Sequence, residues 1–322
     1  MTTQLSNCPP SIRRLIGVPE VGVLVPLIIL SGVFFCVDSS FLSPCSLSVM
    51  LGAIAFVGII AIAQTWLMIA GEIDLSVGSV AGLAAVVAAL AMKVGLPIWV
   101  GLAIGLATGA LAGLINGLLV VRIGVPGFIA TLGMLYIARG TNYLLCNGYP
   151  VYPIPDSLAN FGRAEWYGLS WALGIFVLLA LIGDLTLRRT IFGRMVMATG
   201  GNAEVARIAG IPTGRVRVCC YIASGLFAAL AGVLLMAKLN VGQPEIGTGW
   251  ELNVIASVVI GGVSLLGGIG TVAGTALGLL IMQVMNSGLV ITGANTHWQT
   301  VAVGVIMIAA VSVDLMRRRA KS

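Results

Sequence analysis

The chain has 322 residues, of which 59% are hydrophobic and only 9% are charged, and its formal net charge is +6. A soluble domain of this length carries about 25% charged residues, so this chain has too few polar groups to cover a globule in water. The composition therefore excludes an ordinary soluble protein and indicates that lipid surrounds much of the surface. Because the apolar runs are spread evenly, we expect residues 1–322 to form one membrane domain.

Ten apolar runs approach the length of about 20 residues that a helix needs to cross the hydrocarbon core. In chain order they are residues 21–37, 47–70, 77–92, 98–121, 128–146, 169–187, 216–237, 252–266, 271–289 and 298–316. They predict an all-α integral membrane protein with about ten transmembrane helices. The run 252–266 is short and ends among glycines, so it could be a broken or re-entrant helix. The basic residues at the C-terminal end favour a crossing there, or a second break nearby that restores the orientation.

The basic residues predict the orientation, because cytoplasmic segments of membrane proteins carry an excess of Lys and Arg. With the N-terminus inside, the cytoplasmic segments hold Arg13, Arg14, Arg122, Arg188, Arg189, Arg194, Arg207, Arg215, Arg217, Arg317, Arg318, Arg319 and Lys321, out of 17 basic residues in all. Both termini are therefore expected in the cytoplasm. No basic face with interleaved aromatics is evident, so nucleic acid is not an expected partner.

Five glycines recur at every fourth position in the fourth run: Gly101, Gly105, Gly109, Gly113 and Gly117. They form one helical stripe without side chains, which predicts that another helix packs closely against it. Asn116 beside this stripe is expected to form a hydrogen bond between helices.

Polar residues interrupt the apolar runs at residues 70–79, where Glu72, Asp74 and Ser76 occur together with two glycines. A carboxylate near the hydrocarbon costs about 2.5–3.5 kcal/mol. One interpretation is a short cytoplasmic turn with solvated carboxylates; the other, which we favour, is a helix break that lines or gates a transport pathway. Ser76 is expected to cap the following helix.

The segment 248–257 has a similar arrangement, in which Glu251 and Asn253 open another span. The similarity suggests two related halves with a site at their interface, a common plan among transporters. Arg139 lies in an apolar context and is expected either to reach the outer interface or to pair with an acid within the bundle. These residues complete the predicted substrate pathway.

Two longer polar segments connect the spans. The segment 147–167 is expected to be a periplasmic loop, and its aromatic residues suit either an interfacial belt or a docking surface for an external partner. In the cytoplasmic segment 188–217, Asn202 is expected to cap a short helix over 203–209, which Gly210 and Pro212 terminate. Such a projecting helix suits a groove in a soluble partner.

Catalytic and nucleotide-binding motifs are missing from the sequence. One histidine cannot supply a multi-histidine metal site, so no metal site is expected, and no Walker A sequence occurs. If transport uses ATP, another polypeptide must hydrolyse it.

Four stretches resemble the permease subunits of ribose-type ABC importers of bacteria. Residues 193–211, GRMVMATGGNAEVARIAGI, resemble the coupling segment of that family, and residues 72–79, EIDLSVGS, resemble its second-span signature. Residues 125–140 and 258–271 resemble two further family motifs. The sequence departs from the family at Asn253, where an aspartate is common, and at 293–297.

This resemblance implies a multi-pass protein of the bacterial inner membrane that imports a monosaccharide or a related small polyol. It implies contact with a cytoplasmic ATPase through Gly193, Arg194, Gly200, Gly201, Asn202, Glu204, Arg207 and Gly210. ATP and Mg²⁺ would bind to that ATPase, and this chain would hold no cofactor and be no enzyme. The other implied partners are a periplasmic sugar-binding protein, a second permease subunit, either identical or related, and the lipid bilayer. The alternative is a secondary transporter that uses an ion gradient to move a small polar solute.

Overall fold

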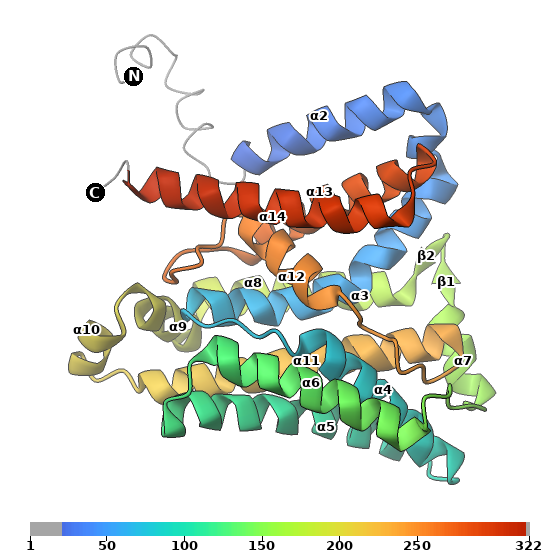
Figure 1. Cartoon of the computed structure of the whole chain (residues 1–322), viewed down its shortest axis with the longest axis horizontal. Helices are drawn as coiled ribbons and strands as arrows, with labels where there is room; N and C mark the ends of the chain where they lie inside the picture. The colour runs from blue at the N-terminus through green and yellow to red at the C-terminus, as the bar shows by residue number, and fades with distance from the viewer. Residues whose placement is uncertain (1–20, 320–322) are drawn as a thin grey trace.

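The computed structural model describes residues 21–319, which fold into a bundle of helices (Figure 1). The longer helices are α2 (Val21–Val37), α3 (Pro44–Ile69), α4 (Val77–Lys93), α5 (Ile98–Leu118), α6 (Gly127–Cys146), α8 (Trp171–Arg189), α11 (Thr213–Leu239), α13 (Val272–Ile291) and α14 (Thr296–Arg319). The shorter elements are the 3₁₀ helix η2 (Ser39–Leu42), the π-helix η3 (Leu119–Ile123), α7 (Asp156–Arg163), α9 (Ile191–Gly201), α10 (Ala203–Ile208) and α12 (Trp250–Ile260). A two-stranded antiparallel hairpin, β1 (Glu165–Trp166) with β2 (Leu169–Ser170), completes the described part.

The all-helical fold class is confirmed, and each of the ten expected spans overlaps one helix. The predicted extent of 252–266 is wrong, because α12 ends at Ile260 and the following residues to Thr271 form a glycine-rich loop. Hydropathy misplaced this end because the loop is as apolar as the helix before it. The predicted cytoplasmic residues Arg13, Arg14 and Lys321 lie outside the described residues.

Five helical stretches within residues 21–319 are long and apolar enough to cross a membrane by length and composition. They are Pro44–Ile69, Ile98–Ile123, Trp171–Arg189, Thr213–Leu239 and Val272–Ile291. Several further helices are apolar but shorter, among them Val77–Lys93 and Trp250–Ile260. The two shorter helices named here are the ones that adjoin the interruptions predicted from the sequence.

The connecting segments gather at the two ends of the bundle (Figure 1). Helices α9 and α10 project from one end, and α7 with the β1–β2 hairpin lies at the opposite end. We refer to these as the α9–α10 end and the hairpin end. The segments 188–217 and 147–167, which the sequence assigned to opposite sides of the membrane, therefore lie at opposite ends of the molecule.

Helix α11 is central to the bundle, where it contacts α3, α4 and α5. Within the glycine stripe of α5, a Cβ on Gly109 would overlap the carbonyl oxygen of Gly225, and one on Gly113 would overlap that of Tyr221, both in α11. The remaining stripe residues lie against α4 and α11: Gly101 faces Met92, Gly105 faces Ala84 and Ala88, and Gly117 faces Val218. The absence of side chains along the stripe thus allows α5 to approach two neighbouring helices closely.

Two stretches of non-helical backbone interrupt the bundle. The first, 70–76, joins α3 to α4, and the second, 261–271, joins α12 to α13. Each uses glycines with positive φ, including Gly71 at +84° in the first and Gly262, Gly267 and Gly268 in the second. Irregular backbone of this kind is tolerated inside a membrane only where protein or water satisfies it. We call these stretches the first and second break.

Candidate functional site

The first break is held in place by a buried network around Asp74, which is 1% exposed. Its Oδ1 accepts hydrogen bonds from the backbone amide of Ser76 at 2.8 Å and from the Ser76 hydroxyl at 2.6 Å. Its Oδ2 accepts from Ser224 of α11 at 2.8 Å, and the Asn116 amide of α5 donates to the Ser76 hydroxyl at 3.0 Å. Asp74 thereby joins the break to two spanning helices, and Asn116, predicted to bond to another helix, bonds to Ser76 of the break instead.

Two expectations for this segment need correction. Ser76 precedes α4, but its side chain makes no cap hydrogen bond, and its own φ and ψ of −82° and −9° are helical. Its hydroxyl instead donates to Asp74 and its oxygen accepts from the Asn116 amide, and the helical backbone of Ser76 differs from the extended conformation that a capping residue adopts. The alternative of a turn with solvated carboxylates is wrong, because Asp74 is buried.

Glu72 joins the first break to α11 a little nearer the α9–α10 end. Its Oε2 accepts a hydrogen bond from the Tyr221 hydroxyl at 3.0 Å, and its Oε1 lies 3.3 Å from Nη1 of Arg217. Gly127 at the start of α6 borders the same cluster, since a Cβ there would lie 2.6 Å from the Tyr221 hydroxyl oxygen. The ion pair thus lies where α6, α11 and the first break meet.

The segment before α12 approaches the first turn of α4. A Cβ on Gly78 would lie 2.5 Å from Glu251 Oε2 and would overlap the carbonyl oxygen of Gly247. The Asn253 amide donates to the Gly249 carbonyl at 3.2 Å within α12. Glu251 of the segment 248–257 therefore lies beside the first turn of α4, with Gly78 at the point of contact.

Arg139 of α6 forms hydrogen bonds to the segment that leads into α12. Its Nη1 donates to the Thr248 hydroxyl at 2.6 Å and to the Pro244 carbonyl at 3.2 Å. Asn142, one turn further along α6, donates to the same carbonyl at 2.9 Å. Arg139 and Asn142 therefore attach α6 to the connection that leads into α12.

A cavity of about 540 Å³ opens at the hairpin end between α3, α11, α12, α13 and the hairpin. Its polar lining residues are Ser48, Glu165, Ser170, Lys238, Asn253, Ser257, Gln283 and Asn286. Two aromatic rings lie along one wall, Phe56 and Trp250, with centroids 6.5 Å apart and planes inclined by 20°. The Lys238 ammonium lies 5.7 Å from the centre of the Phe56 ring, which is within the range of a cation–π interaction.

The cavity has unsatisfied hydrogen-bonding atoms. The side-chain oxygens of Asn253 and Asn286 and the Ser170 hydroxyl are buried and have no hydrogen-bond partner among the described residues. Buried polar atoms are nearly always paired, with protein or with another molecule. These atoms would accept hydrogen bonds from the hydroxyl groups of a guest once their side chains turn toward the open space.

Only one member of the predicted pathway, Asn253, lines this cavity. Glu72, Asp74 and Ser76 are at the first break instead, and the sequence analysis overlooked Phe56, Trp250, Lys238, Gln283 and Asn286 as candidates. Gln283 and Asn286 could have been recognised in the sequence, because they are polar residues inside the apolar run 271–289 and a polar residue inside a spanning segment is costly unless it has a function.

Four glycines from three distant segments meet where the two breaks approach α9. Gly268 in the second break donates its amide to the carbonyl oxygen of Ile69, the last residue of α3, at 2.8 Å. A Cβ on Gly200 of α9 would overlap that same carbonyl oxygen and lie 2.7 Å from the Gly268 nitrogen. A Cβ on Gly267 would lie 3.0 Å from Cα of Gly200 and 3.1 Å from Cα of Gly71. We call this contact of Gly71, Gly200, Gly267 and Gly268 the glycine junction.

The segment with the coupling resemblance lies mostly on the surface at the α9–α10 end. Gly193 is buried against the carbonyl groups at the end of α8, whereas Arg194, Gly201, Glu204, Arg207 and Gly210 are exposed. The predicted cap is confirmed, since Asn202 Oδ1 accepts from the amides of Glu204 and Val205 at 3.0 Å each. Gly210, with φ +85°, follows α10. Ile208 is 79% exposed and gives α10 an apolar tip.

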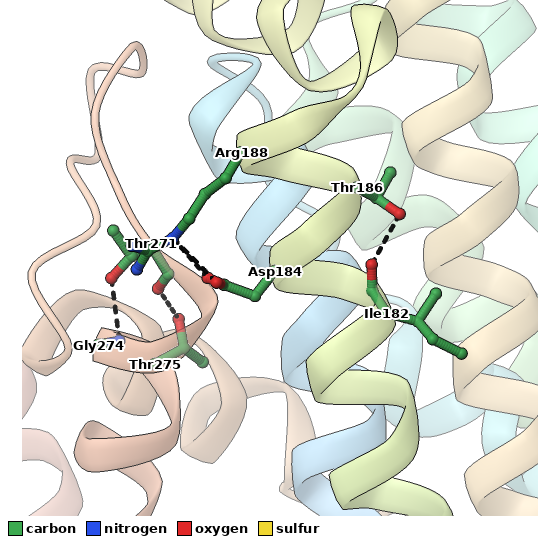
Figure 2. Close-up of polar contacts among 7 residues, drawn as sticks. All are labelled: Ile182, Asp184, Thr186, Arg188, Thr271, Gly274 and Thr275. Atoms are coloured by element: carbon green, nitrogen blue, oxygen red, sulfur yellow. Dashed lines mark hydrogen bonds and ion pairs between the residues drawn. The ribbon is translucent and has the colours of Figure 1, made fainter.

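Figure 2 shows how α8, which leads into this segment, lies against the start of α13. Arg188 pairs with Asp184 at 2.9 Å within α8, and its side chain points toward Thr271. Thr271 caps α13 by accepting from the Gly274 amide at 3.0 Å, and its carbonyl accepts from the Thr275 hydroxyl at 3.3 Å. The Thr275 hydroxyl is also 2.7 Å from that of Thr65 in α3. The first turn of α13 is thus bonded to α3, and the end of the second break lies beside α8.

Comparison with known proteins gives consistent matches along the chain. Residues 46–311 match the family described as "Branched-chain amino acid transport system / permease component". The chain is 36% identical to ribose import permease protein RbsC of Bacillus subtilis (strain 168), with 92% of this chain and 91% of that protein covered. It is 35% identical to L-arabinose transport system permease protein AraH of Escherichia coli (strain K12), covering 84% and 82%. It is also 32% identical to autoinducer 2 import system permease protein LsrC of Photorhabdus luminescens, covering 92% and 89%. No solved structure matches the chain significantly.

Proposed function

This chain belongs to the family of permease components of bacterial ABC importers, and we propose that its cargo is a monosaccharide or a related small polyol. Members of this family are multi-pass membrane subunits without catalytic activity of their own, and they work with an ATPase and a binding protein. Family membership removes the alternative of a transporter driven by an ion gradient. ATP and Mg²⁺ therefore belong to the partner ATPase.

The observation that carries the cargo proposal is the composition of the cavity at the hairpin end. A sugar presents hydroxyl groups around its rim and C–H groups on its faces, so it requires amide partners and an aromatic surface together. Asn253, Gln283 and Asn286 supply the amides, and Trp250 beside Phe56 supplies the aromatic surface. The relatives named above import ribose, L-arabinose or autoinducer 2, and a small polyhydroxylated cargo fits that range.

The proposed topology has ten crossings in a single permease domain over residues 1–322, with both termini and the α9–α10 end in the cytoplasm. The excess of basic residues in segment 188–217 supports this orientation. The segment 147–167 then faces the periplasm. There the exposed rings of Trp166 and Tyr167, 68% and 92% exposed, offer a surface to the binding protein.

Coupling to ATP hydrolysis is proposed to run through the glycine junction. The exposed part of the coupling segment, Arg194, Gly201, Glu204, Arg207 and Gly210, would contact the ATPase, and Gly200 would transmit its movement to Ile69 and Gly268. Such a rearrangement would switch access between two states. The pathway beyond the cavity would be lined or held in place by Glu72, Asp74 and Ser76 of the first break. Glu251 and Arg139, which lie at or beside the segment 248–257, would contribute as well. A second permease subunit, identical or related, would complete the importer.

The test is ATP-dependent uptake of a panel of labelled monosaccharides and polyols into vesicles that contain the permease, its ATPase and its binding protein. Trp250→Ala should lower uptake about three- to tenfold, which corresponds to the loss of an aromatic contact of about 1 kcal/mol. The control, Trp99→Ala, removes a ring that is 72% exposed on α5 and lies outside the cavity. Equal uptake by the two variants, or uptake of no polyhydroxylated compound, would reject the cargo proposal.

A further inference from the structure

A second cavity, of about 590 Å³, lies at the α9–α10 end, where α5 and η3 end and α11 begins. Three arginines line it: Arg122 from η3, Arg207 from α10 and Arg215 from the first turn of α11. Its other lining residues are Leu118, Val121, Ile211, Pro212, Thr213, Gly214, Val218 and Cys219. The cavity thus combines strong positive charge with a largely apolar wall.

The positive charge in this cavity is not compensated by acidic side chains. Arg188 and Arg217, which lie at the same end, pair with Asp184 and Glu72. For the three lining arginines, by contrast, no carboxylate among the side chains that the structure describes lies within the 4.0 Å of an ion pair. The three guanidinium groups are exposed, so water and salt screen part of their mutual repulsion, and an anion bound between them would remove the rest.

The backbone around the cavity also favours the binding of an anion. The π-helical turn η3 continues α5, and it carries Arg122 beyond the regular helix before Gly124, with φ +84°, ends the element. Helix α11 begins after Pro212 without a side-chain cap, so no side chain satisfies its first amide groups. The positive end of a helix of 27 residues therefore adds to the charge of the arginines. The arginines carry the argument, and the helix end only reinforces it.

The apolar wall distinguishes between possible anions. Leu118 and Val121 come from the α5–η3 stretch and Val218 from α11, both of which are long and apolar enough to cross the membrane. Nearby, Ile123 and Phe128 are exposed on the outside of the bundle. A small inorganic anion would leave this wall without a partner, whereas a phospholipid would cover it with an acyl chain. The wall and the charge together therefore match a molecule with a phosphate group and a hydrocarbon tail.

We propose that this cavity binds an anionic phospholipid, with the headgroup phosphodiester between Arg122, Arg207 and Arg215 and an acyl chain along the α5–α11 wall. A zwitterionic lipid would bring a cation of its own toward three arginines, so net negative charge is required. Basic pockets on the cytoplasmic side of membrane proteins recognise lipid headgroups in this way. The proposed orientation of the protein decides only which leaflet supplies the lipid, and with the α9–α10 end in the cytoplasm it is the cytoplasmic leaflet.

The location gives the bound lipid a structural role in coupling. Arg207 belongs to α10, whereas Arg122 and Arg215 belong to the end of the α5–η3 stretch and the start of α11. A single headgroup that contacts all three would hold the exposed α10 against the spanning helices. The stiffness of the connection between the ATPase contact and the bundle would then depend on anionic lipid.

The experiment measures lipid retention directly and does not require transport. The whole importer is purified in detergent with equal amounts of phosphatidylglycerol and phosphatidylcholine, and bound lipids are counted by native mass spectrometry. We compare Arg122→Gln and Arg215→Gln with Arg189→Gln, a matched control that removes one exposed arginine at the same end but outside the cavity. Size-exclusion profiles and thermal denaturation establish that all variants remain folded.

The expected result is preferential retention of phosphatidylglycerol that falls about tenfold in both cavity variants and is unchanged in Arg189→Gln and for phosphatidylcholine. Inorganic phosphate in millimolar excess should not displace the lipid. Equal retention in all variants, or full displacement by inorganic phosphate, overturns the proposal. Loss of the ATPase subunit from Arg122→Gln with unchanged lipid retention would instead assign the arginines to the ATPase contact. Failure of sugar uptake would count against the proposed cargo only and not against the lipid site, because lipid retention is measured without cargo.

Discussion

The backbone amide of Gly268 donates a hydrogen bond of 2.8 Å to the carbonyl oxygen of Ile69, so the second break is attached to the last residue of α3. This carbonyl is one of the terminal groups of α3 that no intrahelical amide can satisfy. The partner comes from a loop far along the chain, and Gly200 of α9 leaves room for it. The hydrogen bond between Gly268 and Ile69 therefore lies at the glycine junction, where the proposed coupling segment contacts both breaks.

Gly200→Ala should disrupt this contact. The added methyl group would overlap the Ile69 carbonyl oxygen and crowd the Gly268 amide, both of which are backbone atoms that cannot rotate away. Overpacking of this kind costs about 1–3 kcal/mol. We expect a lower denaturation temperature in detergent and ATP hydrolysis that no longer drives uptake.

The matched control for Gly200→Ala is Gly201→Ala, at the next residue of the same segment. A Cβ on Gly201 would meet nothing within 4 Å, so stability should stay within about 0.5 kcal/mol of the parent. If Gly200→Ala denatures at the temperature of the parent protein and couples ATP hydrolysis to uptake as well as the parent does, the glycine junction has no mechanical role.

Asp74→Asn should destabilise the protein by about 1–3 kcal/mol. The carboxylate accepts three hydrogen bonds from Ser76 and Ser224 while 1% exposed, and an amide in its place would direct an N–H donor toward a group that also donates. Thermal denaturation of the purified subunit measures the loss. Asp156→Asn, at an exposed position in α7, is the control and should leave the transition unchanged.

Gly109→Leu should separate α5 from α11 and prevent stable folding, since even a Cβ at this position overlaps the Gly225 carbonyl and the Ala229 side chain. The corresponding control is Gly133→Leu in α6, where a Cβ would meet nothing within 4 Å. The yield of monodisperse protein after size-exclusion chromatography distinguishes the two. A normal yield for Gly109→Leu would mean that the close approach of α5 and α11 is not required.

The sequence could predict the helices and the position of the first break, because each depends on residues close together in the chain. Apolar runs mark the helices, and the coincidence of glycine and carboxylate marks the first break. The end of α12 could not be located, because Val263, Leu265 and Leu266 are as apolar as the helix that precedes them. Hydropathy reports burial in protein or lipid and does not report backbone hydrogen bonding.

The cavity and the glycine junction could not be predicted, because both are assembled from segments far apart in sequence. Gln283 and Asn286 fall within one apolar run, and nothing local indicates that they face Trp250 and Asn253 of α12. Glycine has no side chain to reveal its neighbour, so the pairing of Gly200 with Ile69 and Gly268 follows only from the packed bundle. The spacing of glycines in the sequence identifies residues that must pack closely, but only the fold shows which segment each of them packs against.

Substitutions of Asn202 test whether α10 must be a stable helix in order to contact the ATPase. Its side-chain oxygen caps a helix of only six residues by accepting from Glu204 and Val205. Asn202→Leu removes that acceptor at a cost of about 1 kcal/mol. A helix this short has few other hydrogen bonds, so we expect faster amide exchange across Ala203–Ile208 and weaker ATPase binding. Asn202→Asp keeps a capping oxygen and should restore both, whereas equal exchange rates in the two variants would show that α10 is held by packing alone.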